Sequence, residues 1–179
     1  RYIAELSECP ILTAKVEAQL PNLCALIDSL EDPRCIAQIE VATGDEEQAL
    51  IFRNMTPLSA EDQEKLSLFS KEHGFMVFLQ PGSVESIHLL HSPRLEATEA
   101  PLHYSLPEEN VRFAFHPSDF TQVNPGLNRK MVRRALELLE LNEEDEVLDL
   151  FCGLGNFSLP IAGLSTKVVG LEGYSLMVS

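Results

Sequence analysis

Apolar residues between positions 11 and 30 recur at roughly helical spacing, which predicts a helix at the start of the chain. Cys9-Pro10 is expected to start this helix, because proline is well tolerated in the first turn. Pro21 lies inside the run and is expected to kink or split the helix. The recurring residues are Ile11, Leu12, Val16, Leu20, Leu23, Leu26, Ile27 and Leu30.

A second helix is predicted over residues 60–73. Ser59 can cap its first turn, Asp62 follows three residues later, and Gly74 can end it. The predicted core residues of this helix are Leu66, Leu68 and Phe69.

Residues 35–43 and 48–55 are predicted strands, joined as a hairpin by the polar turn at Gly44-Asp45. Further strands are predicted at residues 75–79 and 86–90. Together with the two helices, these strands predict a small central α+β domain over residues 1–92.

Residues 92–109 contain three prolines and are expected to form an irregular connection with one weak strand at 102–106. Residues 111–115 alternate well enough to pair with that strand. Asn124 and Pro125 make a good helix start, so residues 126–141 are a predicted helix. These elements open a second domain over residues 93–179.

Residues 146–160 read EVLDLFCGLGNFSLP, a short apolar strand that leads into a glycine loop and a helix start. Apolar residues flank Asp149, as expected for a parallel strand covered by helices on both faces. Gly153 and Gly155 let backbone amides approach a ligand at the amino end of a helix. A second apolar strand at 167–171 ends at Glu172, whose carboxylate can accept hydrogen bonds from ribose hydroxyls. This order predicts a nucleotide-type cofactor site at the start of an α/β, Rossmann-like domain.

The loop departs from the dinucleotide fingerprint G-x-G-x-x-G, because Ser158 occupies the third position. Pyrophosphate is therefore not the expected ligand. S-adenosylmethionine has no phosphate but carries a ribose, an adenine and a zwitterionic amino acid, which suit Asp149, Asn156 and Glu172. The alternative is an ordinary βαβ turn without a ligand role, in which the glycines are present only because the turn is tight.

The 179-residue chain has a net charge of −15, and its acidic excess lies mainly in residues 1–110, with 19 acidic against 7 basic residues. An acidic surface repels phosphates, so this stretch is expected to bind nucleic acids poorly. No apolar run approaches the length of a membrane span and no signal-peptide pattern opens the chain, so a cytoplasmic protein is expected. The chain begins at Arg1 without methionine and stops after its second cofactor strand. We therefore expect an internal fragment, cut inside its second domain.

The four cysteines show no C-x-x-C spacing, and a disulfide framework is not expected. Cys9, beside a helix start, is by itself more typical of a structural residue. Cys152 lies in the glycine loop near a predicted helix amino end, where thiols are often reactive, and is a candidate nucleophile on the residues alone. His88 and His91 would face opposite sides of a strand and make a poor metal pair.

Residues 120–124, FTQVN, and residues 149–157, DLFCGLGNF, resemble two motifs of the bacterial tRNA and rRNA uracil-5 methyltransferases that use S-adenosylmethionine. The two motifs agree in spacing as well as in letters, and the resemblance covers nearly the whole chain. Residues 8–10, 56–59 and 64–66 are most similar to the branch that acts on 23S rRNA. The resemblance implies that the intact protein methylates carbon 5 of a uridine in 23S rRNA. The alternatives are the same chemistry on tRNA or another rRNA uridine, or a non-catalytic module that binds RNA or protein.

The resemblance places Gln122, Phe151, Asn156 and Glu172 at cofactor-contacting positions, beside Asp149, Gly153 and Gly155. Cys9 corresponds to the last of four cysteines that ligate a [4Fe-4S] cluster in the family, and the other three would precede Arg1. Cys152 falls in the cofactor loop. The cysteine that attacks carbon 6 of the uracil and the base that removes the carbon 5 proton lie in the family beyond the position of Ser179. No catalytic residue is therefore assigned within this chain.

The RNA-binding β-barrel of the family is absent from this sequence, which agrees with its acidic balance. Four basic residues cluster on the helix after Asn124, namely Arg129, Lys130, Arg133 and Arg134. One interpretation of this cluster is a phosphate contact. The favoured interpretation is a solvent-exposed helix face on which Glu137 and Glu140 balance the basic charges. The chain by itself is expected to be inactive and to bind S-adenosylmethionine weakly. Without the remaining strands, a sheet edge and apolar faces are expected to be uncovered, so the chain should either self-associate or be disordered after about Gly163.

Overall fold

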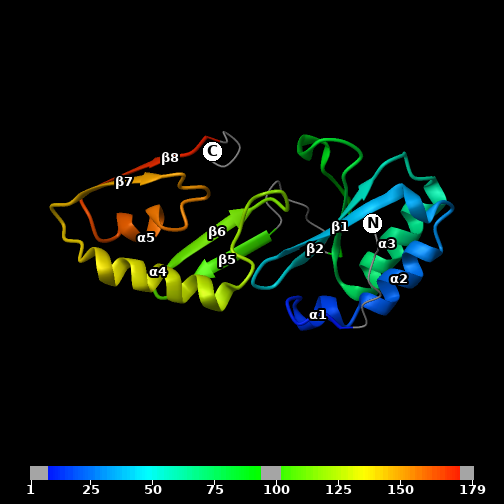
Figure 1. Ribbon diagram of the computed structural model, residues 1–179, viewed down its shortest axis with the longest axis horizontal. Coiled ribbons are helices and arrows are strands. Elements are labelled where there is room, and N and C mark those ends of the chain that lie inside the picture. The colour runs from blue at the N-terminus through cyan, green and yellow to red at the C-terminus, as the bar shows by residue number, and fades with distance from the viewer. Residues whose placement is uncertain (1–7, 94–101, 174–179) are drawn as a thin grey trace. The chain divides into compact units, whose positions relative to one another are not determined.

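The computed structural model describes residues 8–93 and 102–173 of the chain. It divides into two compact units. Of the described residues, the first unit takes 8–41 and 49–93, and the second takes 42–48 and 102–173. Figure 1 labels the elements of both units, which are described separately below.

The first unit is a four-stranded sheet with helices. Its sheet has the order β1-β2-β3-β4, in which β2 and β3 are parallel and β3 and β4 antiparallel. The elements in chain order are α1 (Ala14–Glu17), α2 (Leu20–Asp28), the 3-10 turn η1 (Pro33–Cys35), β1 (Ile36–Thr43), β2 (Gln48–Asn54), α3 (Ala60–His73), β3 (Met76–Leu79), the 3-10 turn η2 (Val84–Ser86) and β4 (His88–His91).

The first predicted helix is split, as Pro21 suggested, because this proline occupies the first turn of α2. The expected start at Pro10 is wrong. Residues 9–12 form a turn in which the Leu12 N–H donates to the Cys9 carbonyl, and the helix begins only at Ala14.

Helix α3 has the predicted bounds. The Ser59 Oγ accepts from the Asp62 N–H at 3.2 Å, and Gly74 ends the helix in the left-handed conformation with φ of 69°. Leu66 and Phe69 are buried as expected, but the assignment of Leu68 to the core is wrong. Leu68 is 50% exposed, because the buried face of the helix runs through residues 62, 66, 69 and 70.

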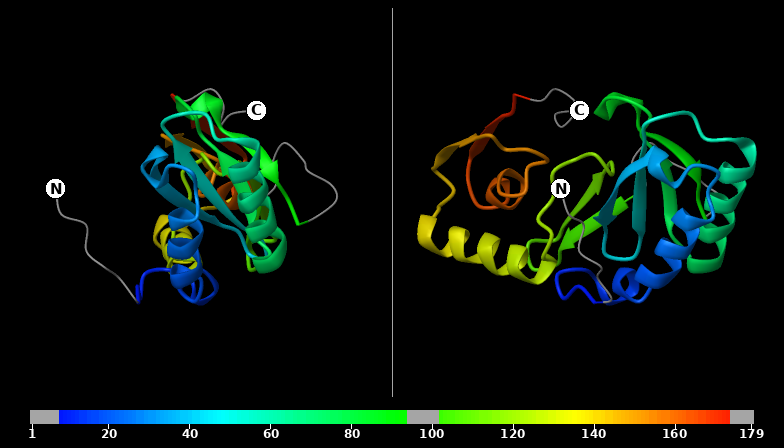
Figure 2. Two further views of the ribbon diagram at one scale, coloured as in Figure 1. Left: turned by 90° about the vertical axis from the view of Figure 1, so that its right-hand side faces the viewer. Right: turned by 45° about the vertical axis from the view of Figure 1, so that its right-hand side comes forward.

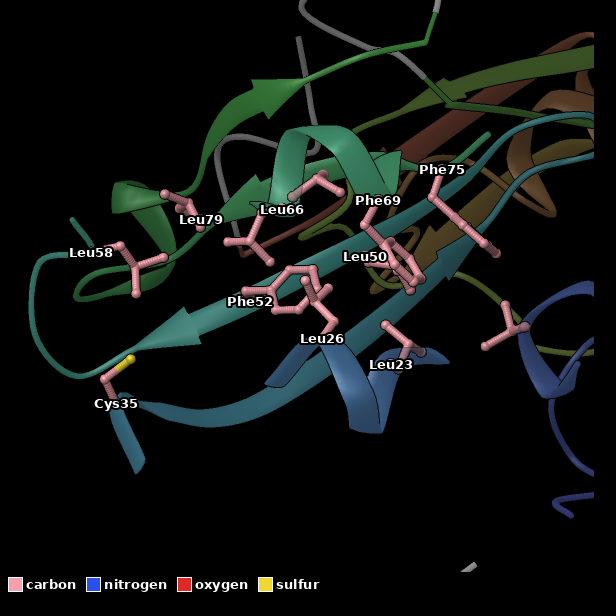
Figure 3. Close-up of a cluster of buried hydrophobic side chains, with 12 residues drawn as sticks. Leu23, Leu26, Cys35, Leu50, Phe52, Leu58, Leu66, Phe69, Phe75 and Leu79 are labelled. Carbon is pink, nitrogen blue, oxygen red and sulfur yellow. The ribbon is translucent and has the colours of Figure 1, made fainter. Parts of the chain in front are cut away.

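The core of the first unit lies between the sheet and helices α2 and α3. Figure 3 shows Leu50 and Phe52 of β2 among side chains from both helices. Ala49 and Ile51, which point to the opposite face of the same strand, are also buried. Both faces of β2 are therefore removed from solvent.

The second unit contains two small sheets and two helices. Strands β5 and β6 pair antiparallel, and β7 and β8 pair parallel. Figures 1 and 2 show α5 between the β7–β8 pair and α4. The elements are β5 (Leu102–Leu106), β6 (Val111–Phe115), α4 (Pro125–Leu139), β7 (Glu146–Leu150), α5 (Ser158–Ala162) and β8 (Lys167–Leu171).

Helix α4 starts as predicted, with the Asn124 Oδ1 accepting from the Leu127 N–H at 2.9 Å. It ends at Leu139, two residues earlier than expected, because Glu140 adopts a left-handed conformation with φ of 48°. Its buried face packs on β5 and β6 around Leu106, Phe113 and Val132.

The prediction that helices cover both faces of β7 is wrong for the described residues. Val147 and Asp149 are half-buried on the side of α5, whereas Leu148 and Leu150 are each 57% exposed on the other side. Of the two expected alternatives, self-association or a disordered tail after about Gly163, the second does not hold up to Gly173, and residues 174–179 lie outside the described residues. All five residues of β8 pair with β7, and this pairing orders the segment.

Candidate cofactor loop

The loop after β7 turns sharply through three residues with positive φ. These are Phe151 at 63°, Gly153 at 55° and Gly155 at 87°. Only the glycines adopt this conformation without steric cost, so the spacing of the two glycines follows from the shape of the turn. The N–H groups of Phe151 and Cys152 both donate to the Leu171 carbonyl, at 2.7 and 3.1 Å, and fasten the loop to the end of β8.

The acid after β8 reaches the glycine loop, as the sequence predicted. The Gly153 N–H donates to the Glu172 Oε2 at 2.9 Å. Register explains this contact. Leu150 pairs with Leu171, so the residues that follow the two parallel strands leave the sheet at the same edge.

Asp149 and Ser158 form a second link across the loop. The Ser158 Oγ donates to the Asp149 Oδ2 at 2.6 Å, and Ser158 is the first residue of α5. The serine at the third position of the fingerprint therefore has a local role. It joins the end of β7 to the start of the helix.

Gly170 of β8 has no side chain, which leaves space for the side chains of Cys152 and Ser158. A Cβ at residue 170 would lie 2.8 Å from the Cys152 Sγ, 3.2 Å from its Cβ and 3.4 Å from the Ser158 Oγ. Cys152 thus packs against the sheet.

Asn156 is held by two residues outside the βαβ unit. Its side-chain amide exchanges a reciprocal pair of hydrogen bonds with Asn128 of α4, both at 2.9 Å. Its Oδ1 also accepts from the Tyr104 hydroxyl of β5 at 3.2 Å. Burial raises the pKa of Tyr104 above its ordinary value, so this phenol stays a neutral donor.

Sequence reasoning missed both Tyr104 and Asn128. Each carried a signal. Tyr104 lies on the same strand face as the apolar Leu102 and Leu106, and Asn128 lies four residues before Val132 on the buried face of α4. A polar group at a core-facing position needs a buried partner. The sequence did not reveal that the partner is Asn156.

The amides of the two glycines are paired inside the loop. The Gly155 N–H donates to the Cys152 carbonyl at 2.9 Å, and the Gly153 N–H is bound to Glu172. The glycines therefore serve the conformation of the loop, and their amides are not directed at a ligand.

Gln122 lies in the exposed segment before α4, two residues ahead of the helix cap at Asn124. No hydrogen bond or ion pair joins its side chain to another residue of the described ranges. The structure thus brings Asp149, Gly153, Asn156 and Glu172 into one loop region, and among the described residues Gln122 forms no hydrogen bond with them.

Cys9 does not form a metal site with residues of the described part of the chain. Within 8–93 and 102–173 no three His, Cys, Asp or Glu side chains gather around a common point. Cys9, Cys24, Cys35 and Cys152 are free thiols in this structure. His91 also has a structural role, because its Nδ1 lies 2.7 Å from the buried Ser70 Oγ.

The basic residues of α4 are largely neutralised by acids. Arg129 contacts the Asp45 carboxylate at 3.2 Å, and Arg134 contacts Glu137 at 2.9 Å, while Arg133 pairs with Glu108. These pairs agree with the interpretation of a solvated helix face, although Glu140 ends the helix and is not seen to pair with it.

A sequence model of the tRNA (uracil-5-)-methyltransferase family matches residues 98–174, the stretch that holds the cofactor loop. A Legionella pneumophila (strain Lens) protein named 23S rRNA (uracil(1939)-C(5))-methyltransferase RlmD is 51% identical over 178 residues, which are 99% of this chain and 39% of that protein. The protein of the same name from Xanthomonas oryzae pv. oryzae (strain MAFF 311018) is 46% identical over the whole chain and 39% of its own length. The chain belongs to the RNA uracil-5 methyltransferase family.

A solved structure shares the fold of this chain. The chain is similar to the crystal structure of the Pyrococcus abyssi tRNA (uracil-54, C5)-methyltransferase in complex with S-adenosyl-L-homocysteine, with a TM-score of 0.68 at 18% identity. The similarity covers 99% of this chain and 44% of that one. The chain thus spans about two fifths of the length of the curated relatives named above. Within the described residues, no helix combines the length and apolarity that a membrane span requires.

Proposed function

We propose that the protein carrying this chain transfers a methyl group from S-adenosylmethionine to carbon 5 of a uridine in 23S rRNA. The names of relatives that are 46–51% identical over nearly the whole chain support the choice of reaction and substrate. The observation that carries the proposal is the bond from the Gly153 N–H to Glu172. It brings the glycine loop and the acid that a nucleoside-binding βαβ unit requires to one edge of the sheet.

Within this proposal, the two units have different roles. Residues 1–92 form a central α+β domain, and residues 93–179 begin a Rossmann-like methyltransferase domain. Strands β7 and β8 with helix α5 are its first βαβ unit. The parallel register of the two strands over five residue pairs supports this assignment.

The loop residues have chemically distinct tasks toward the cofactor. Glu172 accepts hydrogen bonds from the ribose hydroxyls, and the exposed ring of Phe151 forms a wall of the site. Asn156 and Gln122 hold the amino-acid end, and Asp149, Gly153 and Gly155 keep the shape of the loop. When bound, S-adenosylmethionine supplies a methyl group on a sulfonium centre. No residue of the chain is proposed to act on the uracil itself.

The donor set at Cys9 does not fit an iron–sulfur cluster by itself. A [4Fe-4S] cluster needs four ligands, and the described residues bring no further ligand to Cys9. No step of the proposed reaction is routed through a cluster.

Methyl transfer can be tested directly with the protein that carries this chain. Methyl-labelled S-adenosylmethionine is incubated with unmodified 23S rRNA and, separately, with unmodified tRNA. Label recovered as 5-methyluridine from 23S rRNA alone is the expected result. Label in tRNA alone would show that the substrate is tRNA and not 23S rRNA. Label in neither RNA would overturn the proposal.

The role of Glu172 is tested by Glu172→Gln, which keeps the size of the side chain and removes its charge. We expect the dissociation constant for S-adenosylhomocysteine, measured by calorimetry, to rise roughly tenfold, because hydrogen bonds to charged groups contribute about 1.5–3 kcal/mol. Glu146→Gln, at the far end of β7, is the matched control and should leave binding unchanged. Equal affinity of wild type and Glu172→Gln would remove Glu172 from the cofactor site.

A further inference from the structure

We infer that Tyr104 and Asn128 are positioning residues of the cofactor loop, which act through the side chain of Asn156 and fix the group it offers to the cofactor. The inference deepens the proposed function and rests on it. Neither residue belongs to the βαβ unit. Tyr104 lies on β5 and Asn128 on α4.

The network occupies most of the hydrogen-bonding capacity of the Asn156 side chain. The Asn156 Oδ1 accepts two hydrogen bonds, from the Tyr104 hydroxyl at 3.2 Å and from the Asn128 Nδ2 at 2.9 Å. These bonds occupy both lone pairs of the carbonyl oxygen. The Asn156 Nδ2 donates one of its two hydrogens to the Asn128 Oδ1 at 2.9 Å. Counted over the described residues, one N–H donor of the Asn156 side chain remains, and no acceptor of it.

The remaining donor defines the chemistry that Asn156 recognises. A single amide N–H matches an acceptor, and the carboxylate of the methionine moiety is an acceptor-only group. The ammonium group of the same moiety would need an oxygen, which the network has already used. The arrangement therefore assigns Asn156 to the carboxylate side of the cofactor's amino-acid end.

Both positioning residues rest on rigid surroundings. Asn128 is 4% exposed, one turn after the capped start of α4. The Tyr104 ring stacks on Phe113, with centroids 4.5 Å apart and an interplanar angle of 12°, and meets Phe115 edge-on at 5.8 Å. A loop with two glycines and three positive φ angles has many alternative conformations. The network selects one of them by holding the loop at residue 156.

Two substitutions test the network at different strengths. Tyr104→Phe removes only the hydroxyl and keeps the ring stacking, and Asn128→Ala removes the reciprocal amide pair. We expect the dissociation constant for S-adenosylhomocysteine, measured by calorimetry on the protein that carries this chain, to rise about twofold to fivefold for Tyr104→Phe and roughly tenfold for Asn128→Ala. Glu137→Gln, which breaks an exposed pair on the same helix, should leave the constant unchanged.

Amide hydrogen exchange on the 179-residue chain provides a readout that needs no cofactor. Exchange at Gly153, Gly155 and Asn156 should accelerate about twofold to tenfold in Tyr104→Phe, while exchange in β7 and β8 stays as in the wild type. Unchanged loop exchange together with unchanged affinity in Tyr104→Phe would overturn the inference, even if Asn128→Ala fails to fold. Wild-type protein that binds no S-adenosylhomocysteine would instead overturn the proposed function, and with it the cofactor part of the inference.

Discussion

In the first unit both faces of β2 are buried, whereas in the second unit the β7–β8 pair is covered on one face only. Leu50, Ile51 and Phe52 are at most 1% exposed. Across the uncovered face of the second pair, Leu148 lies beside Val169 and Leu150 beside Leu171, and all four are between 39% and 57% exposed. The same residue types therefore contribute very differently to the stability of the two units.

This difference separates two ways of holding a structure. The first unit is stabilised mainly by apolar burial around a shared core. Apolar burial is non-directional, and it tolerates substitutions between apolar residues of similar volume. The glycine loop of the second unit is fixed by a few directional contacts, among them the bonds of Glu172, Ser158 and Asn156. Its exposed apolar face remains a predicted surface for self-association.

The largest expected contrast comes from two truncations. Phe52→Ala should lower the free energy of unfolding of the first unit by about 3–5 kcal/mol, because it leaves a cavity among fully buried neighbours. Leu148→Ala should change the stability of the second unit by less than about 0.5 kcal/mol, since its side chain is largely solvated. Urea unfolding followed by residue-resolved amide exchange reports the two units separately. A large loss for Leu148→Ala would show that its face is covered in solution.

A smaller effect is expected from adding one carbon inside the second unit. Gly170→Ala should destabilise the β7–β8 pair by about 1–3 kcal/mol, because the new Cβ would meet the Cys152 Sγ at 2.8 Å. The measurement is amide exchange of β7 and β8 relative to the wild type.

A second substitution distinguishes this clash from a change in backbone propensity. Cys152→Ala removes the Sγ, so the double variant Gly170→Ala, Cys152→Ala should recover most of the loss. The same exchange rates in the single and double variants would show that Cys152 does not limit the packing of β8.

Local signals explain which parts of the fold the sequence predicted. Helix α3 has its predicted bounds because Ser59 and Gly74 act on their immediate neighbours. Leu68 was misassigned because a helical repeat alone does not say which of two adjacent positions faces the sheet, and the burial of β7 depended on elements far along the chain. The glycine loop and Glu172 could be predicted because their meeting follows from two parallel strands. Tyr104 and Asn128 could not, since they lie 52 and 28 residues from Asn156.

The smallest effect concerns a buried charge in the first unit, where directional contacts supplement the apolar core. Burial opposes ionisation of Asp62, but hydrogen bonds from the Lys65 ammonium and the Glu31 N–H outweigh it and hold the pKa of this carboxyl below its ordinary value. A carboxyl with a lowered pKa stabilises the folded state above its unfolded pKa, and this stabilisation is lost as the pH falls through the folded pKa. Asp62→Asn should therefore cost roughly 1 kcal/mol at pH 7. The difference from wild type should shrink below about pH 4, the ordinary range of an aspartate.

Urea unfolding of the first unit at a series of pH values measures this difference, with Glu64→Gln, exposed on the same helix, as the control for loss of one negative charge. A cost of Asp62→Asn that stays the same from pH 7 to pH 3 would mean that the carboxylate contributes through its shape and not through its charge. The contrast between the units would then sharpen, because the first unit would owe its stability to apolar burial and neutral hydrogen bonds. A cost that disappears in acid would instead show that one ion pair, formed at 3.0 Å by the buried Asp62 and the half-buried Lys65, makes the first unit sensitive to pH.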